Sequence, residues 1–166
     1  MVLQQGRCAH KEGLSRSKGQ SSTAAAAYRA GVCITDERTG EVFDYTRKRG
    51  IEHSEIIVPE KAHADLQRMA DMSRSTDPNE RGEGQAAFWN ANEKAHKRGD
   101  SIVAREIEVD IPHELSAEDR LQLVRDFGRA LADKWGCGVQ ASLHEPRTVS
   151  DRDLQRKPDQ FHVTDP

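Results

Sequence analysis

The fold is decided by one stretch of the chain, Ser101-Ile-Val-Ala-Arg-Glu-Ile-Glu-Val-Asp-Ile-Pro112. Charged and β-branched residues alternate over six of its positions and the run ends at a proline, which indicates a strand. Side chains of a strand point alternately to its two faces, so one face is acidic and the other apolar. The acidic face carries Glu106, Glu108 and Asp110, and the apolar face carries Ile107, Val109 and Ile111.

Helices and further strands are expected on both sides of this strand. Ser116-Ala-Glu-Asp119 is a helix-start box, and spaced apolar residues continue that helix to Gly136. The other expected elements are a hairpin between Cys33 and Phe43, strands over 7–13, 55–58 and 138–144, and helices over 22–31, 61–72 and 86–97. This mixture suits an α+β domain of two layers with a mainly antiparallel sheet.

Two segments carry no apolar periodicity. Residues 73–84 are polar and contain proline and glycine, so they are expected to form a loop. The tail from 145 to 166 is rich in aspartate, arginine and proline and is expected to be irregular. The 166 residues therefore predict one domain over 1–144 followed by this tail.

The composition predicts a cytoplasmic protein. No run of the chain approaches a membrane span, and the first residues have neither an apolar signal core nor a cleavage pattern. Cys8, Cys33 and Cys137 are isolated and odd in number, which favours buried free thiols over a disulfide framework or a zinc site.

A tyrosine ends a short alanine helix in the segment Ser15-Arg-Ser-Lys-Gly-Gln-Ser-Ser-Thr-Ala-Ala-Ala-Ala-Tyr-Arg-Ala-Gly31. A serine or threonine can cap the start of this helix, and Gly31 is placed to end it. The alanines leave room for a bulky ligand, so Tyr28 is a candidate nucleophile beside a phosphate. The alternative is a core tyrosine whose hydroxyl reaches the surface.

Positive charge gathers around this tyrosine, although the whole chain has a net charge of -3. Residues 1–50 hold nine Lys/Arg and five Asp/Glu, a difference of +4. The candidate DNA-binding residues form two clusters, Arg16, Lys18 and Arg29 around the helix and Arg47, Lys48 and Arg49 after the hairpin. These clusters could neutralise phosphates, or they could be ordinary solvated turns.

Three features could act together in catalysis: Tyr28, the acidic face of Glu106 and Glu108, and His144 at a strand end. A tyrosine hydroxyl attacks phosphorus poorly unless a base or a cation favours the phenolate. A divalent ion can polarise the phosphate, and imidazole is a usual ligand of such ions. The other reading is a solvated acidic face and a structural histidine.

From Ser17 to Leu143, six segments in order resemble the MobA/MobL group of plasmid mobilisation relaxases, which are MobQ-type members of the HUH endonuclease superfamily. The segments are Lys18-Gly-Gln-Ser with Ala24-Ala-Ala-Ala-Tyr-Arg-Ala-Gly31, Asp36-Glu-Arg-Thr-Gly40, Asp44-Tyr-Thr-Arg-Lys48, Glu52-His-Ser-Glu55, Ala104-Arg-Glu-Ile-Glu108 and Pro112-His-Glu-Leu115. The resemblance implies an HUH relaxase-like fold and a nicking domain over 1–144.

The resemblance also implies a reaction. Such relaxases nick one DNA strand at an origin of transfer and stay joined to the 5′ phosphate through a tyrosine, whose place Tyr28 takes. A divalent metal, Mg or Mn, is held by three histidines, and His144 matches the first of them. Glu106 or Glu108 matches an acidic position beside the site. The implied partners are single-stranded DNA, relaxosome accessory proteins and coupling proteins.

The chain departs from the family pattern at its end. It contains no His-x-His, which would supply the other two histidines, and only His162 could substitute. The chain is therefore expected to be truncated in the tail and to lack its last metal-bearing strand. Two alternatives to a nicking enzyme follow: an inactive remnant that still binds single-stranded DNA, or a fold remnant in which Tyr28 only packs.

Overall fold

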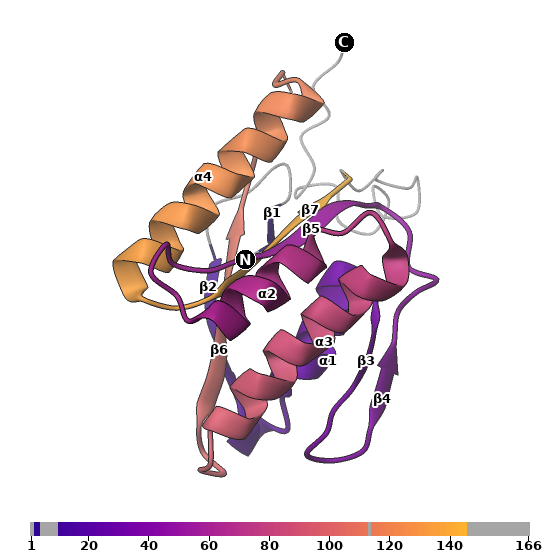
Figure 1. Cartoon of the computed structure of the whole chain (residues 1–166), viewed down its shortest axis with the longest axis vertical. Coiled ribbons are helices and arrows are strands. Elements are labelled where there is room, and N and C mark those ends of the chain that lie inside the picture. The colour runs from indigo at the N-terminus through magenta and orange to yellow at the C-terminus, as the bar shows by residue number, and fades with distance from the viewer. Residues whose placement is uncertain (1, 4–9, 113, 146–166) are drawn as a thin grey trace, which may run out of the picture.

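The centre of the fold is a five-stranded sheet, seen in a computed structural model that describes residues 2–3, 10–112 and 114–145 (Figure 1). Its strands in spatial order are β2 (His10–Ser15), β6 (Ile102–Val109), β1 (Val2–Leu3), β7 (Val139–His144) and β5 (Ile51–Ile57). The two long pairings, β2 with β6 and β5 with β7, are antiparallel, and the two-residue β1 runs parallel to both of its neighbours. The α+β class and the mainly antiparallel sheet are confirmed.

Helices pack on the sheet, and local signals mark the ends of the first and the last of them. They are α1 (Ser22–Ala30), α2 (Ala64–Ser73), α3 (Pro78–Ala95) and α4 (Ala117–Trp135), preceded by a short 3-10 helix, η1 (Arg16–Lys18). Ser21 and Ser116 cap α1 and α4 with their hydroxyls, and Gly31 and Gly136 end these helices in the left-handed conformation. None of the helices in the described ranges is long and apolar enough to cross a membrane.

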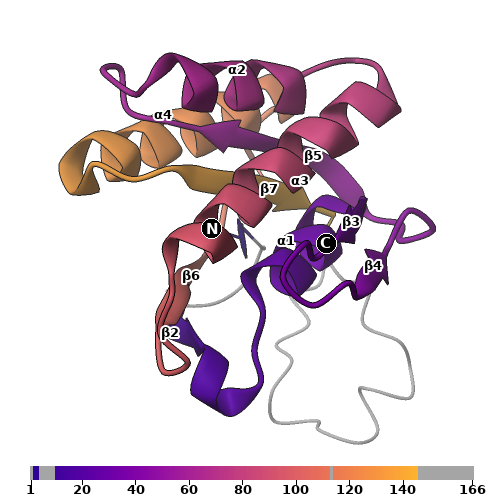
Figure 2. The same cartoon turned by 60° about the horizontal axis from the view of Figure 1, so that its bottom comes forward.

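The predicted hairpin is present as a second, two-stranded sheet. It pairs β3 (Cys33–Thr35) with β4 (Val42–Asp44) in antiparallel register. Gly40 in its turn has a φ of 76°, a conformation that side chains disfavour. Figure 2 shows the hairpin beside α1, so it forms one wall of the surface around that helix.

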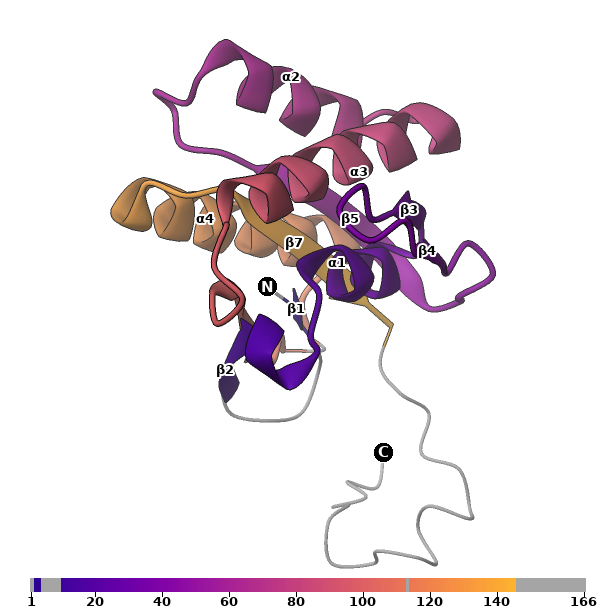
Figure 3. The same cartoon turned by 90° about the horizontal axis from the view of Figure 1, so that it is seen from below.

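Helices cover both faces of the main sheet. Alternate residues of β7 contact different helices. Ala141 and Leu143 pack in one cluster with Val124 and Ala132 of α4. On the other face, Gln140 bonds to the carbonyl oxygen of Ala26 in α1. Figure 3 shows α1 in front of β7 and α4 behind it. The structure thus adds a third layer to the two expected from the sequence.

The loop predicted over 73–84 is wrong for its second half. α3 begins at Pro78, and the Asp77 carboxylate caps it by accepting from the backbone N–H of Asn79 at 2.8 Å. The helix continues through Gly82 and Gly84, and a Cβ at Gly84 would lie 2.6 Å from the backbone nitrogen of Ser73. Glycine is therefore present here because α2 and α3 approach each other closely.

The cysteines of the described residues differ from the expectation. Cys33 and Cys137 are free thiols, as predicted, but both are exposed instead of buried. Cys33 lies on the outer face of the three-residue β3, and Cys137 follows the end of α4. Cys8 lies outside the described residues, as does the predicted tail from 146 onward.

Glu55 of β5 is a buried carboxylate that joins the sheet to two helices. It accepts from Arg74 Nε after α2 and from Arg125 Nε of α4, both at 2.7 Å, and contacts His53 Nε2 at 2.9 Å. Burial alone would raise the pKa of this carboxyl, but the hydrogen bonds from His53, Arg125 and Arg74 lower it to about 2. Glu55 is therefore charged throughout the ordinary pH range.

Acid should destabilise the fold through Glu55. Its folded pKa of about 2 lies below the ordinary value of 4.5, so its contribution is complete above pH 4.5 and is lost as the pH falls toward 2. The loss amounts to at most about 3 kcal/mol. Urea unfolding at pH 6 and pH 3 should show a smaller drop in stability for Glu55→Gln than for the wild type. Equal drops would mean that other carboxylates carry the acid sensitivity.

The outer edge of β5 is covered by side chains. Ser73 Oγ accepts from the backbone N–H of Ile56 at 2.8 Å, and Arg74 Nη2 donates to the carbonyl oxygen of Ile56 at 3.2 Å. Arg129 of α4 donates to the carbonyl oxygen of Val58 at 2.5 Å. Backbone groups that a neighbouring strand would otherwise bind are thus satisfied within the molecule.

Candidate active site

Tyr28 lies near the end of α1 and faces outward. Ala26 and Ala27 on the buried side of the helix are 4% and 0% exposed, whereas Tyr28 is 39% exposed. Because helical residues project in different directions, the alanines dock the helix and leave the tyrosine at the surface. This position agrees with an accessible hydroxyl and not with a core tyrosine.

The turn after β4 supplies the neighbours of the Tyr28 ring. Tyr45 packs its ring edge-on against Tyr28, with centroids 5.3 Å apart and planes at 87°. Lys48 Nζ lies 3.5 Å from the Tyr28 ring centroid and donates to the Tyr28 carbonyl oxygen at 2.7 Å. The Arg29 guanidinium lies 5.4 Å from the same centroid. The tyrosine therefore sits in a cationic and aromatic environment.

Arg29 connects α1 to the acidic face of β6. Its guanidinium forms an ion pair with Glu106 and lies 3.7 Å from Glu108 Oε1. Both carboxylates project to the side of the sheet that α1 covers, which is the shared face that their spacing predicts. The structure thus brings these two acids to the residue next to Tyr28.

His144 lies under the same helix end. It is 8% exposed, and its Nε2 lies 2.9 Å from the carbonyl oxygen of Arg29. A carbonyl oxygen can only accept, so Nε2 carries the proton in this hydrogen bond. Through the side chain and the backbone of Arg29, the structure gathers Tyr28, Glu106, Glu108 and His144 around one end of α1.

A complete metal site is not formed by the described residues. Within residues 2–3, 10–112 and 114–145, no group of three or more His, Cys, Asp or Glu side chains could hold an ion. His144 offers one imidazole, and His162 lies outside the described residues. The donor side chains of the described residues therefore do not fit a bound divalent ion by themselves.

The predicted DNA-binding residues other than Arg29 and Lys48 divide into two groups. Lys18, Arg47 and Arg49 are exposed and could meet a phosphate. Arg16 has a side chain only 9% exposed; it pairs with the Glu93 carboxylate and donates to the carbonyl oxygens of Glu93 in α3 and of Arg98 after it. Its guanidinium is occupied, so Arg16 acts in this structure as a structural residue.

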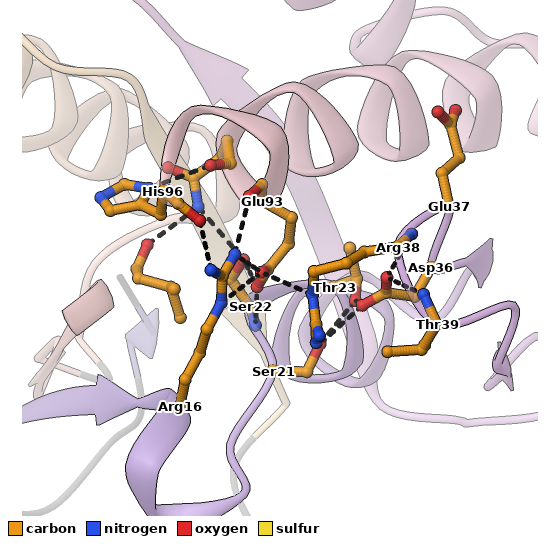
Figure 4. A network of polar contacts seen from close by, with 12 residues as sticks. Arg16, Ser21, Ser22, Thr23, Asp36, Glu37, Arg38, Thr39, Glu93 and His96 are labelled. Atoms are coloured by element: carbon orange, nitrogen blue, oxygen red, sulfur yellow. Dashed lines mark hydrogen bonds and ion pairs between the residues drawn. The ribbon is translucent and has the colours of Figure 1, made fainter. Parts of the chain in front are cut away.

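The start of α1 is held by two carboxylates that sequence reasoning missed, Glu93 and Asp36 (Figure 4). Glu93 of α3 accepts from the Ser22 backbone N–H at 2.9 Å and from Ser22 Oγ at 2.6 Å. Asp36 accepts from Thr23 Oγ at 2.7 Å. Negative charge at a helix start is favourable, so these contacts fix where α1 begins.

Both carboxylates stay charged despite their burial. Burial alone would raise the pKa of Glu93, but hydrogen bonds from Ser22 and Arg16 hold it below its ordinary value. The pKa of Asp36 is lowered in the same way, because hydrogen bonds from Thr23, Arg38 and Thr39 outweigh burial. Asp36 begins one of the family-like segments, whereas no local signal identifies Glu93.

Comparisons with known proteins point to one family. The model of the MobA/MobL family matches residues 20–163. A mobilization protein MobL of Acidithiobacillus ferridurans is 51% identical over 153 residues, which cover 92% of this chain and 35% of that protein. A conjugal transfer protein TraA of Rhizobium radiobacter is 39% identical over 115 residues, which cover 69% of this chain and 10% of that protein.

A solved structure, described as "Molecular Basis of Vancomycin Resistance Transfer in Staphylococcus aureus", shares the fold. It matches with a TM-score of 0.68 and 26% identity, and the match covers 84% of this chain and 62% of that one. The matched part of this chain spans about a third of the length of the MobL relative and a tenth of the length of the TraA relative.

Proposed function

The chain belongs to the MobA/MobL family, and on that basis we propose that it is a relaxase domain that nicks one DNA strand at an origin of transfer during plasmid mobilisation. The observation that carries the proposal is the exposed Tyr28, with Arg29 gathering Glu106, Glu108 and His144 beside it. Single-stranded DNA is the proposed substrate. Relaxosome accessory and coupling proteins are proposed partners.

The proposed step is a transesterification. Tyr28 Oη attacks the phosphorus, a bond to the 5′ phosphate forms, and the bond between phosphorus and the 3′ oxygen breaks. The phenol gives up its proton and the departing 3′ oxygen takes one. Glu106 and Glu108 are candidates to accept the phenol proton. The 3′ hydroxyl can reverse the exchange, so no ATP is consumed.

A divalent ion, Mg or Mn, remains a proposal, with His144 as a candidate ligand. When bound, such an ion would polarise the phosphate and stabilise the charge that develops on it. The described residues gather no set of three donors around His144. The described residues expose Tyr28, bind Glu106 and Glu108 through Arg29 and fix the start of α1.

Covalent capture tests the proposed function. The full chain is incubated with single-stranded oligonucleotides that tile the DNA flanking its gene, with Mg²⁺, with Mn²⁺ or with EDTA. A denaturing gel should show a protein–DNA adduct with at least one oligonucleotide and a divalent ion. If none of the oligonucleotides gives an adduct, nicking by this chain is refuted. If the adduct forms equally well in EDTA, the requirement for a divalent ion is refuted.

A second candidate function is DNA binding without cleavage. It is favoured by the exposed Lys18, Arg47 and Arg49 around α1, together with the incomplete set of metal donors among the described residues. Exposed cations along the path of a DNA strand can bind its phosphates without cutting it. In that case the oligonucleotides bind in a salt-dependent manner and no adduct forms.

Neutralising the two exposed arginines should weaken binding and reduce its salt dependence. In the variant Arg47→Gln with Arg49→Gln, the slope of log affinity against log salt should become shallower by about 1.4, because each lost phosphate contact to a single strand changes it by roughly 0.7. Fluorescence anisotropy with a single-stranded oligonucleotide between low and moderate salt measures the slope. Lys134→Gln on α4 is the control, because that exposed lysine lies on the other side of the sheet. An unchanged slope in the double variant would exclude these arginines from the DNA path.

A further inference from the structure

The chain segment after β4 forms a tight turn, residues 44–48, that folds back on α1. The Tyr45 backbone N–H donates to the carbonyl oxygen of Val32 at 3.2 Å, and the Lys48 N–H donates to that of Tyr45 at 2.9 Å. Asp44 accepts from the Thr46 N–H at 2.9 Å and from its hydroxyl at 2.7 Å. These bonds give the turn a defined shape next to the end of α1.

Tyr45 is anchored in the molecule, so it offers Tyr28 a fixed wall. Its ring packs against the cluster formed by Ala26, Ala27, Val32 and Ile34. Its edge-to-face contact with Tyr28 is an arrangement that aromatic rings favour. Tyr28 projects from an exposed part of α1, and this wall limits the directions that its ring can take.

Lys48 makes a second contact with the Tyr28 ring. Its Nζ has two contacts with one residue, 3.5 Å to the Tyr28 ring centroid and 2.7 Å to the Tyr28 carbonyl oxygen. A cation is attracted to the face of an aromatic ring, and the attraction grows if the phenol becomes negatively charged. Lys48 is half-buried, whereas its neighbours Arg47 and Arg49 are exposed.

We propose that Tyr45 and Lys48 are positioning residues that hold the Tyr28 ring for attack on the phosphate, and that Lys48 is not one of the phosphate contacts. This inference rests on the proposed function, in which Tyr28 is the nucleophile. Attack requires the hydroxyl oxygen to lie in line with the phosphorus, and small misplacements of reacting groups slow such reactions strongly. Lys48 and Tyr45 would therefore change the rate of the step and not the affinity for DNA.

Single-turnover kinetics separate the two roles of neighbouring cations. The rate of adduct formation is measured over a range of oligonucleotide concentrations for Lys48→Met and for the matched control Arg47→Met. Lys48→Met should lower the maximal rate roughly tenfold and leave the half-saturating DNA concentration unchanged. Arg47→Met should raise the half-saturating concentration and leave the maximal rate unchanged. Lys48→Arg should recover most of the rate, since a guanidinium also binds a ring face.

The aromatic wall is tested in the same assay. Tyr45→Phe keeps the ring and should retain the rate, whereas Tyr45→Ala removes it and should lower the maximal rate. The proposal is overturned if Lys48→Met behaves like Arg47→Met, because Lys48 would then be a phosphate contact. It is equally overturned if Lys48→Met and Tyr45→Ala both react at the wild-type rate.

A measurement without DNA keeps this inference distinct from the proposed function. In the free protein, the NMR resonances of the Tyr28 ring protons report the nearby Tyr45 ring and Lys48 charge. They should shift in Tyr45→Ala and Lys48→Met and stay in place in Arg47→Met. Unchanged resonances in the first two variants would overturn the contacts. If the two variants shift the resonances as expected but the wild type forms no adduct, the contacts are confirmed. The nicking function and the effect on its rate are then both refuted.

Discussion

Tyr28→Phe should abolish the covalent protein–DNA adduct, lowering its rate of formation by roughly four orders of magnitude or more. The substitution removes the hydroxyl oxygen that is proposed to bond to phosphorus and keeps the ring. The contacts of the ring with Tyr45 and Lys48 do not use the hydroxyl oxygen. The free energy of unfolding should therefore change by no more than about 0.5 kcal/mol. The adduct is scored on a denaturing gel with the oligonucleotide that wild type captures.

Tyr45→Phe is the matched control, because the chain has two tyrosines and their rings are in contact. This variant should form the adduct at a rate close to that of wild type. If Tyr28→Phe still forms the adduct and Tyr45→Phe does not, the nucleophile is Tyr45. If Tyr28→Phe changes stability and leaves the chemistry unaltered, Tyr28 is a packing residue.

Gly84→Ala should destabilise the fold by about 2–3 kcal/mol, although it adds one methyl group. The new Cβ would lie 2.6 Å from the Ser73 nitrogen and 2.8 Å from the Met69 carbonyl oxygen, both backbone atoms. Backbone cannot move aside as a flexible side chain can, so α2 and α3 would have to separate. Urea unfolding monitored by circular dichroism measures the loss.

Gly82→Ala in the same helix should act in the opposite direction. A Cβ at Gly82 meets nothing within 4 Å, and alanine favours a helix over glycine by roughly 0.8–1 kcal/mol. The two variants therefore have the same chemistry and opposite expected signs. A similar loss in both would mean that glycine is needed for the flexibility of α3 and not for the helix contact.

Local signals predict the elements that depend on neighbouring residues. The strand of Glu106 and Glu108, the helix of Tyr28 and the hairpin are all present, because periodicity, caps and turn residues act over a few positions. The first turns of α3 are not predicted, although Asp77 and Pro78 are helix-start residues. The glycines of this segment indicate a loop until their packing partner, α2, is known.

Part of the site also depends on distant contacts. The period of two places Glu106 and Glu108 on one face, but it does not predict the role of Arg29, which joins them to His144. The expectation that Arg16 meets DNA rests on its neighbours in sequence. Its partner Glu93 lies 77 residues away, and no local pattern reports such a pair.

The covered edge of β5 has a consequence for behaviour in concentrated solution. An open strand edge is a template on which a second molecule can add a strand, and this is a common route to aggregation. Ser73, Arg74 and Arg129 already bind the outward backbone groups of Ile56 and Val58. Along that stretch, a strand of a second molecule would have to displace these side chains before it could pair with β5. This part of the edge therefore resists edge-to-edge association between copies of the chain.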